Sequence, residues 1–261
     1  VGIERVEQIG WSLVSEKRAV VQQAYRLQIA KDDRFADVIF DSGMVESTES
    51  AHIEMKEEQL SLESTTLYFI RVMTEAACGT KETEKTDWYE GTFVTALLSK
   101  KEWLAEFVTV EKETDKGESR GSYLRSSFGI AKEIRSAYVY ATALGLYQMY
   151  LNGQKVGSDE LTPGWTSYRK HLLYQMYDVK DLLVSGKNVM GAFVGAGWYK
   201  GTMGFMRMRN HYGDRAAFAA QLEITYTDGS RETIITDDKW QGAFGPVIFS
   251  EIYDGERYDA R

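Results

Sequence analysis

The chain has 261 residues, of which 43% are hydrophobic and 13% aromatic, and its formal net charge is −8. This length suits one large domain or two ordinary ones, and the apolar content is sufficient for folded cores rather than a disordered tail. The negative charge disfavours nucleic acid and anionic membrane surfaces as partners, because binding to either requires clustered lysine and arginine.

Targeting signals and cysteine content bear on the compartment. No apolar run approaches the roughly 20 residues of a membrane span, and no secretory signal peptide is visible. Cys78 is the one cysteine, so no internal disulfide can form and an oxidising compartment is not required. We therefore expect a cytoplasmic protein. Because the chain starts at Val1, a trimmed N-terminus leaves secretion open as the alternative.

The first part of the chain shows the period-2 alternation of half-buried β-strands. Two strands are predicted, at residues 23–29 and 67–72, and their apolar faces consist of Tyr25, Leu27 and Ile29 and of Tyr68, Ile70 and Val72. Asp41, Ser42 and Gly43 form a turn signal between them. Residues 1–98 are therefore predicted to form a small β-sandwich of short strands.

Residues 99–121 differ in character and are interpreted as a connector followed by a charged loop. Ser99 is a suitable N-cap for a short helix over residues 100–107. Residues 111–119 are rich in charged side chains and have no apolar face, so we expect a solvated surface loop there.

Residues 99–261 are predicted to form a second β-domain. An alternating strand at residues 147–151 runs into Asn152-Gly153, the strongest two-residue hairpin signal. A longer alternation from Phe218 to Tyr226 ends at Asp228-Gly229, and residues 231–236 return as a second hairpin. Asp178 is placed to cap one helical turn over residues 178–183. Short strands separated by turn signals predict a sandwich or jelly roll.

Two motifs suggest chemistry but are assigned none. Residues 195–201 resemble the start of a dinucleotide-binding turn, but the third glycine is late and Trp198 and Tyr199 would crowd a pyrophosphate. We interpret this stretch as a strand end that requires close backbone approach. Asp254 and Glu256 would lie about 6.6 Å apart along a strand, within the roughly 6.5–9.5 Å of inverting glycosidases. Any Asp-x-Glu in a strand meets that spacing, so no catalytic residue is assigned.

Aromatic and polar residues in the second domain form the best candidate binding site. Aromatic rings stack on the C–H faces of sugars, and Asn and Asp make directional hydrogen bonds to hydroxyls. The candidate sugar-binding residues are Trp165, Tyr168, Trp198, Tyr199, Asn210 and Asp214. The alternative is that Trp165 and Trp198 are core residues. No His-x-x-x-His, Cys-x-x-Cys or EF-hand pattern is present, so no metal ligand is assigned.

A methionine-rich stretch follows these aromatics. It contains Met203, Phe205, Met206 and Met208 in what is predicted to be a loop. Methionine side chains adapt to irregular apolar surfaces. The stretch is therefore expected either to fold back on the core or to pack against a neighbouring domain.

Six blocks of the second domain, in order and spacing, resemble the N-terminal domain of bacterial α-L-rhamnosidases. They are residues 145–157, 161–170, 174–179, 197–201, 212–215 and 253–261. Residues 11–13, 23–27, 41–43 and 68–72 resemble the fibronectin-III-like domain that precedes it in that family. The resemblance covers essentially the whole chain. It implies an all-β protein in which a fibronectin-III-like β-sandwich, residues 1–98, is followed by a jelly-roll β-sandwich, residues 99–261.

The resemblance also implies a function. Whole enzymes of this family hydrolyse terminal α-L-rhamnose from glycosides with inversion, using two glutamates in an (α/α)6 barrel that lies C-terminal to such a segment. We therefore expect accessory domains without acid or base of their own. The expected partners are that catalytic domain in the same polypeptide, and rhamnosides or plant or bacterial polysaccharide fragments. The alternatives are an autonomous rhamnose- or carbohydrate-binding module and a structural, protein-interacting β-sandwich.

Calcium is the one cofactor that the resemblance raises. In some members the jelly-roll domain is a calcium-dependent rhamnose-binding module, whose ligand loops would lie here near Tyr168 and residues 210–215. Arg169 and Lys170 follow Tyr168, where a calcium ligand would be Asp or Asn. Cations at this place would repel Ca²⁺, so the expectation is that no cofactor is bound.

Overall fold

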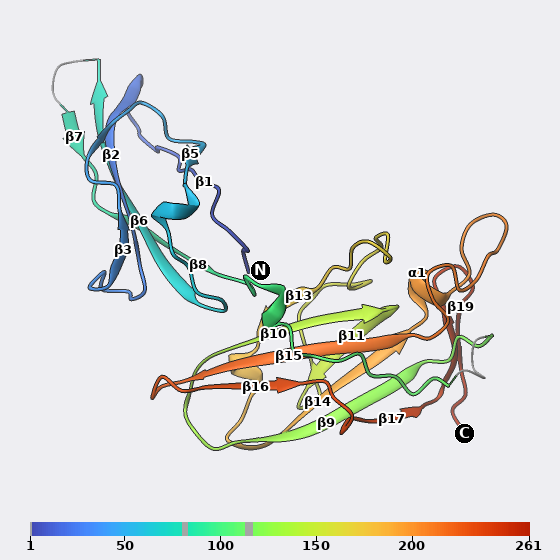
Figure 1. Ribbon diagram of the computed structural model, residues 1–261. Coiled ribbons are helices and arrows are strands. Elements are labelled where there is room, and N and C mark those ends of the chain that lie inside the picture. The colour runs from blue at the N-terminus through green and yellow to red at the C-terminus, as the bar shows by residue number, and fades with distance from the viewer. Residues whose placement is uncertain (1, 80–82, 113–116) are drawn as a thin grey trace. The chain divides into compact units, whose positions relative to one another are not determined.

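The computed structural model describes residues 2–79, 83–112 and 117–261, which form strands with only short helical turns (Figure 1). The chain divides into two compact units, Val1–Glu102 and Trp103–Arg261. Among the described residues, no helix is long and apolar enough to span a membrane. The all-β class expected from the alternation is confirmed.

The strands of the first unit form a six-stranded and a two-stranded antiparallel sheet. The larger sheet has the order β3-β2-β6-β7, with β4 also beside β2 and β8 beside β6, while β1 pairs with β5. The strands are β1 (Gln8–Ile9), β2 (Val20–Ala30), β3 (Val38–Asp41), β4 (Val45–Glu46), β5 (Ile53–Glu54), β6 (Leu67–Cys78), β7 (Thr83–Lys85) and β8 (Tyr89–Val94). The predicted strands at 23–29 and 67–72 lie within β2 and β6.

The core of the first unit follows the predicted faces. Tyr25, Leu27, Ile29 and Tyr68 are buried in one apolar cluster, against which Ile70 and Val72 pack. The predicted turn after β3 is also confirmed, because Gly43 has a φ of +62° and its N–H donates to Asp41 Oδ1 at 2.9 Å.

The second unit contains two stacked antiparallel sheets and a hairpin (Figure 1). The four-stranded sheet has the order β13-β10-β15-β16, the five-stranded sheet has the order β12-β11-β14-β9-β17, and β18 pairs with β19. The elements are β9 (Ser122–Ile130), β10 (Ile134–Leu144), β11 (Leu146–Leu151), β12 (Gln154–Lys155), β13 (Gln175–Asp178), β14 (Gly186–Gly195), α1 (Gly197–Lys200), β15 (Ala217–Tyr226), β16 (Arg231–Ile235), β17 (Gln241–Phe244), β18 (Val247–Glu251) and β19 (Gly255–Tyr258).

The core of the second unit lies between these sheets. One apolar cluster joins Val139 and Leu222 of the four-stranded sheet to Met149 and Met190 of the five-stranded sheet. Both predicted hairpins are confirmed, since Leu151 pairs with Gln154 and Thr225 with Arg231. A 3-10 turn at Lys180–Leu182 accounts for the predicted helical turn, and Asp178 Oδ1 accepts the Lys180 N–H at 3.1 Å.

The outer face of the four-stranded sheet is covered by irregular segments of the same unit. Tyr140 on this face is fully buried, and its ring lies 5.8 Å from that of Tyr174. Gln221 Oε1 accepts the Leu104 N–H at 2.7 Å, and Thr142 Oγ1 donates to the Leu173 carbonyl at 2.6 Å. Residues near 104 and 173 therefore cover the outer face of this sheet.

The helix predicted over residues 100–107 is wrong. Only a 3-10 turn at Lys100–Glu102 forms, with Ser99 Oγ accepting the Lys101 N–H at 3.3 Å. Beyond it the Glu106 N–H donates to the Thr236 carbonyl and the Val108 N–H to the Phe218 carbonyl. The backbone of this segment is hydrogen-bonded to β15 and to the residue that follows β16, and these bonds replace those that a helix would provide.

Candidate functional site

The candidate site is built on the loops at the end of the second unit where β14 leads into α1. Gly197 begins α1 with a φ of +53°. A Cβ at this position would lie 2.7 Å from Leu146 Cγ and 3.0 Å from the Gly145 carbonyl carbon. Only glycine permits this close approach, as predicted for the glycine-rich strand end. The resulting sharp turn places Trp198 against Trp165 and Tyr199 against Tyr168.

Trp165 supplies the exposed aromatic surface of the site. Its side chain is 52% exposed, and its ring stacks nearly parallel to that of Trp198, with a centroid separation of 5.8 Å and an angle of 9°. Trp165 Nε1 also donates a hydrogen bond to the Tyr212 hydroxyl at 3.3 Å. The alternative that Trp165 is a core residue is therefore wrong, while Trp198 is half-buried beneath it.

The two tyrosines of the predicted set pack against each other. The Tyr168 ring meets the edge of Tyr199 at 5.2 Å and lies 5.0 Å from the Tyr212 ring. The Tyr168 hydroxyl donates to the Gly164 carbonyl at 3.0 Å, and burial raises the pKa of Tyr168 to about 12. These packed rings lie beside the exposed Trp165 surface and connect the loop that contains Tyr168 to the loop that contains Tyr212.

The two polar candidates lie on the loop that follows α1, where both are partly buried. The Asn210 N–H donates to the Lys200 carbonyl at 2.9 Å, and Asn210 has a φ of +54°. Asp214 lies 3.7 Å from Arg215 Nε. Burial and the nearby Asp214 charge raise the pKa of Tyr199. Of the six predicted residues, Trp165, Tyr168 and Tyr199 contact Tyr212, which the sequence analysis did not select as a site residue.

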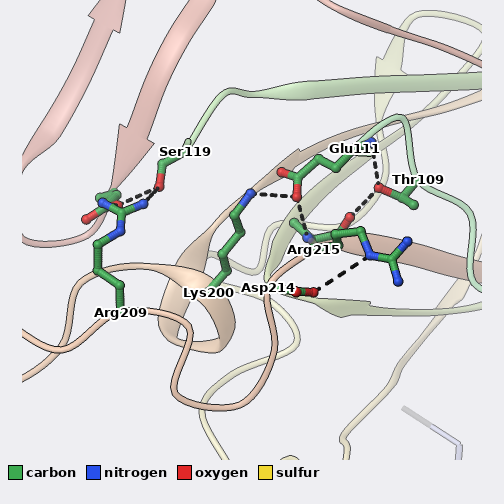
Figure 2. Close-up of polar contacts among 9 residues, drawn as sticks. Thr109, Glu111, Ser119, Lys200, Arg209, Asp214 and Arg215 are labelled. Atoms are coloured by element: carbon green, nitrogen blue, oxygen red, sulfur yellow. Dashed lines mark hydrogen bonds and ion pairs between the residues drawn. The ribbon is translucent and has the colours of Figure 1, made fainter. Parts of the chain in front are cut away.

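A buried ion pair beneath these loops was missed. Lys200 Nζ lies 2.6 Å from Glu111 Oε2, with side-chain exposures of 0% and 2% (Figure 2). The same carboxylate oxygen accepts the Ala216 N–H at 3.0 Å. Thr109 Oγ1 accepts the Glu111 N–H at 3.1 Å and donates to the Ala216 carbonyl at 2.6 Å. Glu111 therefore joins the end of α1 to the start of β15.

A second buried carboxylate anchors the loop after α1 from the other side. The Glu251 side chain is fully buried and lies 2.6 Å from Arg209 Nη1. It also accepts hydrogen bonds from the Ser119 hydroxyl and from the Thr202 N–H. Arg209 Nη2 in turn donates to Ser119 Oγ at 2.7 Å (Figure 2). Burial alone would raise the pKa of Glu251, but these hydrogen bonds and the Arg209 charge outweigh it and lower the pKa.

These clusters correct the prediction of a solvated loop at the two ends of residues 111–119, whereas Lys112, Gly117 and Glu118 are exposed as predicted. Glu111 and Ser119 are 5% and 2% exposed, and residues 113–116 of this stretch lie outside the described residues. A charged side chain is buried when a counter-charge and hydrogen bonds compensate its lost hydration. Here those partners come from segments far along the chain. The local charge pattern therefore gave no signal of the burial.

The methionine-rich stretch does not fold back on the core. It forms a narrow turn closed by the Met203–Met208 bridge. Its tip is exposed, with Phe205 101% and Met206 80% accessible. The loop that follows α1 projects away from the sheets (Figure 1). That it packs against a neighbouring domain stays a prediction.

The acidic residues at the C-terminal hairpin do not form an acid–base pair. Asp254 lies 2.7 Å from Arg207 Nη2, and the hydrogen bond from this guanidinium lowers the Asp254 pKa. Glu256 lies in the exposed β19 strand. A general acid must keep its proton near neutral pH, and the environment of Asp254 acts in the opposite direction.

Comparisons with known proteins agree with this two-unit architecture. Residues 132–261 match the model of the α-L-rhamnosidase N-terminal domain, and residues 2–99 match that of the Rha78A-like N-terminal immunoglobulin domain. The chain belongs to the N-terminal region of the α-L-rhamnosidase family. The immunoglobulin description applies to the unit that was predicted to be a small β-sandwich and for which the family resemblance implied a fibronectin-III-like fold. Both folds are sandwiches of short antiparallel strands.

Individual α-L-rhamnosidases show how much of such proteins the chain represents. One from Streptomyces avermitilis is 46% identical over 55% of this chain and 14% of its own length. One from Formosa agariphila is 30% identical over 96% of this chain and 28% of its own length. The crystal structure of the Aspergillus terreus α-L-rhamnosidase superposes with a TM-score of 0.88 at 34% identity, covering 100% of this chain and 30% of that one. The chain thus spans less than a third of each.

In these loops of the rhamnosidase N-terminal domain, Arg169 and Lys170 lie where the resemblance would place a calcium ligand. Within residues 2–79, 83–112 and 117–261, no three His, Cys, Asp or Glu side chains gather in a group that would hold a metal. Arg169 Nη2 donates to the His211 carbonyl at 2.9 Å. A guanidinium thus bridges the two loops and occupies a carbonyl oxygen of the kind that calcium would require.

Proposed function

We propose that this chain supplies two accessory β-domains to a longer polypeptide that removes terminal α-L-rhamnose from glycosides. The observation that carries the proposal is the consecutive match of both N-terminal family models, together over residues 2–99 and 132–261. The α-L-rhamnosidases that resemble the chain are several times longer. The chemistry of the longer polypeptide would then lie outside these two units.

The environments of three carboxylates, two of them buried, support an accessory role. Glu111 and Glu251 lie against Lys200 and Arg209, and Asp254 lies against Arg207. The pKa values of Glu251 and Asp254 are lowered, for Glu251 because hydrogen bonds outweigh burial and for Asp254 because of Arg207. Such groups are ionised near neutral pH and engaged in holding loops, which suits neither a general acid nor a free base.

Hydrolysis of p-nitrophenyl α-L-rhamnoside tests the proposal. The purified chain should release no nitrophenol above the buffer rate, whereas the longer polypeptide should turn the substrate over. Turnover by the chain alone, which Glu251→Gln or Asp254→Asn then removes, would contradict the accessory role. Absence of turnover by the longer polypeptide would contradict the proposed activity.

A second candidate function, rhamnose binding by the loop end, is favoured by Trp165. A half-exposed indole stacked on a second indole offers a rigid apolar surface of the kind that binds a sugar ring. The Arg169 bridge between the loops implies that such binding needs no calcium.

Calorimetric titration with L-rhamnose, with calcium or with a chelator, tests this function. The heat of binding should be the same in both conditions and should disappear in Trp165→Ala. Tyr89→Ala, which removes an aromatic side chain that is 78% exposed in the first unit, is the matched control. No heat at millimolar sugar, or heat that requires calcium, would overturn it.

A further inference from the structure

The outer face of the five-stranded sheet contains a hollow that the loop site does not use. It has a volume of about 700 Å³. Side chains from four neighbouring strands line it, namely Tyr123, Arg125, Gln148, Tyr150, Phe193 and Gln241. This volume is in the range of small-molecule and sugar pockets.

The strand register explains the shape of the hollow. In one row across the sheet Tyr150, Gly191, Arg125 and Gln241 lie side by side. Because Gly191 has no side chain, the sheet surface is depressed at this position and is flanked by the side chains of Tyr150 and Arg125. The next row on the same face places Phe193 between Gln148 and Tyr123. The Tyr123 and Phe193 rings are in contact, 4.9 Å apart, and form an aromatic wall.

A second hollow continues the first along the strands. It has a volume of about 380 Å³, shares Gln148 and Phe193 with the larger hollow, and reaches Gly195 and Glu256. From Gly191 to Gly195 along β14 the distance is about 13 Å, at roughly 3.3 Å per residue. The two hollows together form an elongated groove, which suits a chain of several linked units better than a single ring.

The lining of the larger hollow is chemically suited to a neutral sugar chain. Aromatic rings supply apolar surface, and two amides and one guanidinium supply donors and acceptors. The Tyr150 hydroxyl donates to Gln148 Oε1 at 3.1 Å, and Arg125 Nη2 approaches Gln241 Oε1 at 3.5 Å. These contacts orient both amides, and the Gln148 side chain also donates to Glu160, which leaves each NH₂ group with at least one further hydrogen to donate. Arg125 is the one charged side chain among the described residues that line this hollow, so the lining does not select a polyanion.

The position of the groove disfavours an extended peptide as its occupant. A peptide that adds to a sheet requires a strand edge with free backbone groups. The groove instead lies over β14, which is paired on both sides by β11 and β9. Recognition must therefore come from side chains. Amides and aromatic rings are the groups that recognise sugar hydroxyls and C–H faces.

We propose that this groove is a second carbohydrate-binding surface, which holds a neutral oligosaccharide chain ending in α-L-rhamnose. The identity of the terminal sugar rests on the proposed function, whereas the groove itself is independent of the Trp165 site. In this arrangement the groove retains the chain of a glycan substrate, and the loop end contacts single rhamnose units.

The test is an NMR titration of the ¹⁵N-labelled chain with a neutral rhamnose tetrasaccharide and, separately, with L-rhamnose. The tetrasaccharide should shift the amide signals of Gly191 and Phe193 and bind the groove at least tenfold more tightly than L-rhamnose. Tyr150→Ala and Gln148→Ala should each weaken this binding about tenfold. Ser127→Ala, on the same strand as Tyr123 and Arg125, should leave it unchanged. Tyr150→Phe keeps the aromatic ring and is the control for folding. It should retain most of the binding that Tyr150→Ala loses.

The proposal is overturned if the tetrasaccharide leaves the groove signals unshifted, or if Trp165→Ala rather than Tyr150→Ala abolishes the shifts. Hydrolysis of p-nitrophenyl α-L-rhamnoside by the longer polypeptide is measured separately. Hydrolysis without groove binding overturns the groove alone, and groove binding without hydrolysis overturns the proposed function alone. If the longer polypeptide buries the Tyr150 side chain and binds no tetrasaccharide, the groove is a domain interface and the proposal fails.

Discussion

The outer faces of the two sheets of the second unit have similar residues, but these are buried on one sheet and accessible on the other. On the four-stranded sheet, Tyr140 and Gln221 are 0% and 1% exposed, because irregular segments near residues 104 and 173 lie over them. On the five-stranded sheet, Tyr150 and Gln148 line an open groove. Tyrosine and glutamine therefore stabilise the fold on one face and are available for binding on the other. What lies over each sheet decides the difference.

Matched tyrosine substitutions should show the largest difference in stability between the two outer faces. Tyr140→Ala should lower the free energy of unfolding by about 3–5 kcal/mol, as expected for deletion of a large buried aromatic side chain. Tyr150→Ala should cost about 1 kcal/mol or less, because its side chain is only partly buried. Urea unfolding followed by NMR signals of β15 measures both. Equal losses would show that the two outer faces are equivalent.

The ion pair that links the ends of the two sheets should have an effect of similar size. Lys200→Met leaves the buried Glu111 carboxylate without its cation, which should cost about 3–5 kcal/mol. Adding Glu111→Gln should restore much of the loss, because both buried charges are then gone while the amide oxygen can still accept the Ala216 N–H. The same unfolding measurement applies. A double variant no more stable than Lys200→Met would contradict this account.

The Glu251 carboxylate should make the stability of the second unit depend on pH. Its pKa in the folded state is below the ordinary value of 4.5, so its contribution is complete above pH 4.5 and is lost as the pH falls through the folded pKa. Glu251→Gln should cost about 1.5–3 kcal/mol at pH 7, and the difference from the unaltered chain should shrink below pH 4.5. Unfolding at pH 7 and pH 3.5 measures this. A difference independent of pH would contradict the assignment.

Matched glutamine substitutions have the smallest expected effect and sharpen the comparison most. Gln221→Ala removes the acceptor of the Leu104 N–H, which should cost about 1–3 kcal/mol. Gln148→Ala on the open face should change stability by no more than about 0.5 kcal/mol while weakening oligosaccharide binding. Stability and binding are measured on the same samples. A stability loss in Gln148→Ala as large as that in Gln221→Ala would assign it a structural role.

Part of the candidate site could be predicted from local sequence. Glycines at a strand end predicted the close approach at Gly197, and aromatic residues in turn-rich segments predicted the cluster around Trp165. Two features of the site could not be predicted from the sequence, namely the different exposure of the two tryptophans and the place of Tyr212. Trp165 is an exposed platform and Trp198 its half-buried support, yet both lie beside glycines in similar contexts. Tyr212 joins the cluster only because its loop folds back over Tyr168.

The sequence by itself determined several of the strands, their inward faces and two hairpin turns. These depend on alternation with a period of two and on residues that tolerate positive φ, both of which are local properties. Only the tertiary structure decided which outward residues are covered and which charges are buried. Glu111 and Lys200 are 89 positions apart. A buried charge is stabilised by its partner, and an outward tyrosine is buried by whatever segment lies over it. Neither of these neighbours can be identified from the residue's own stretch of chain.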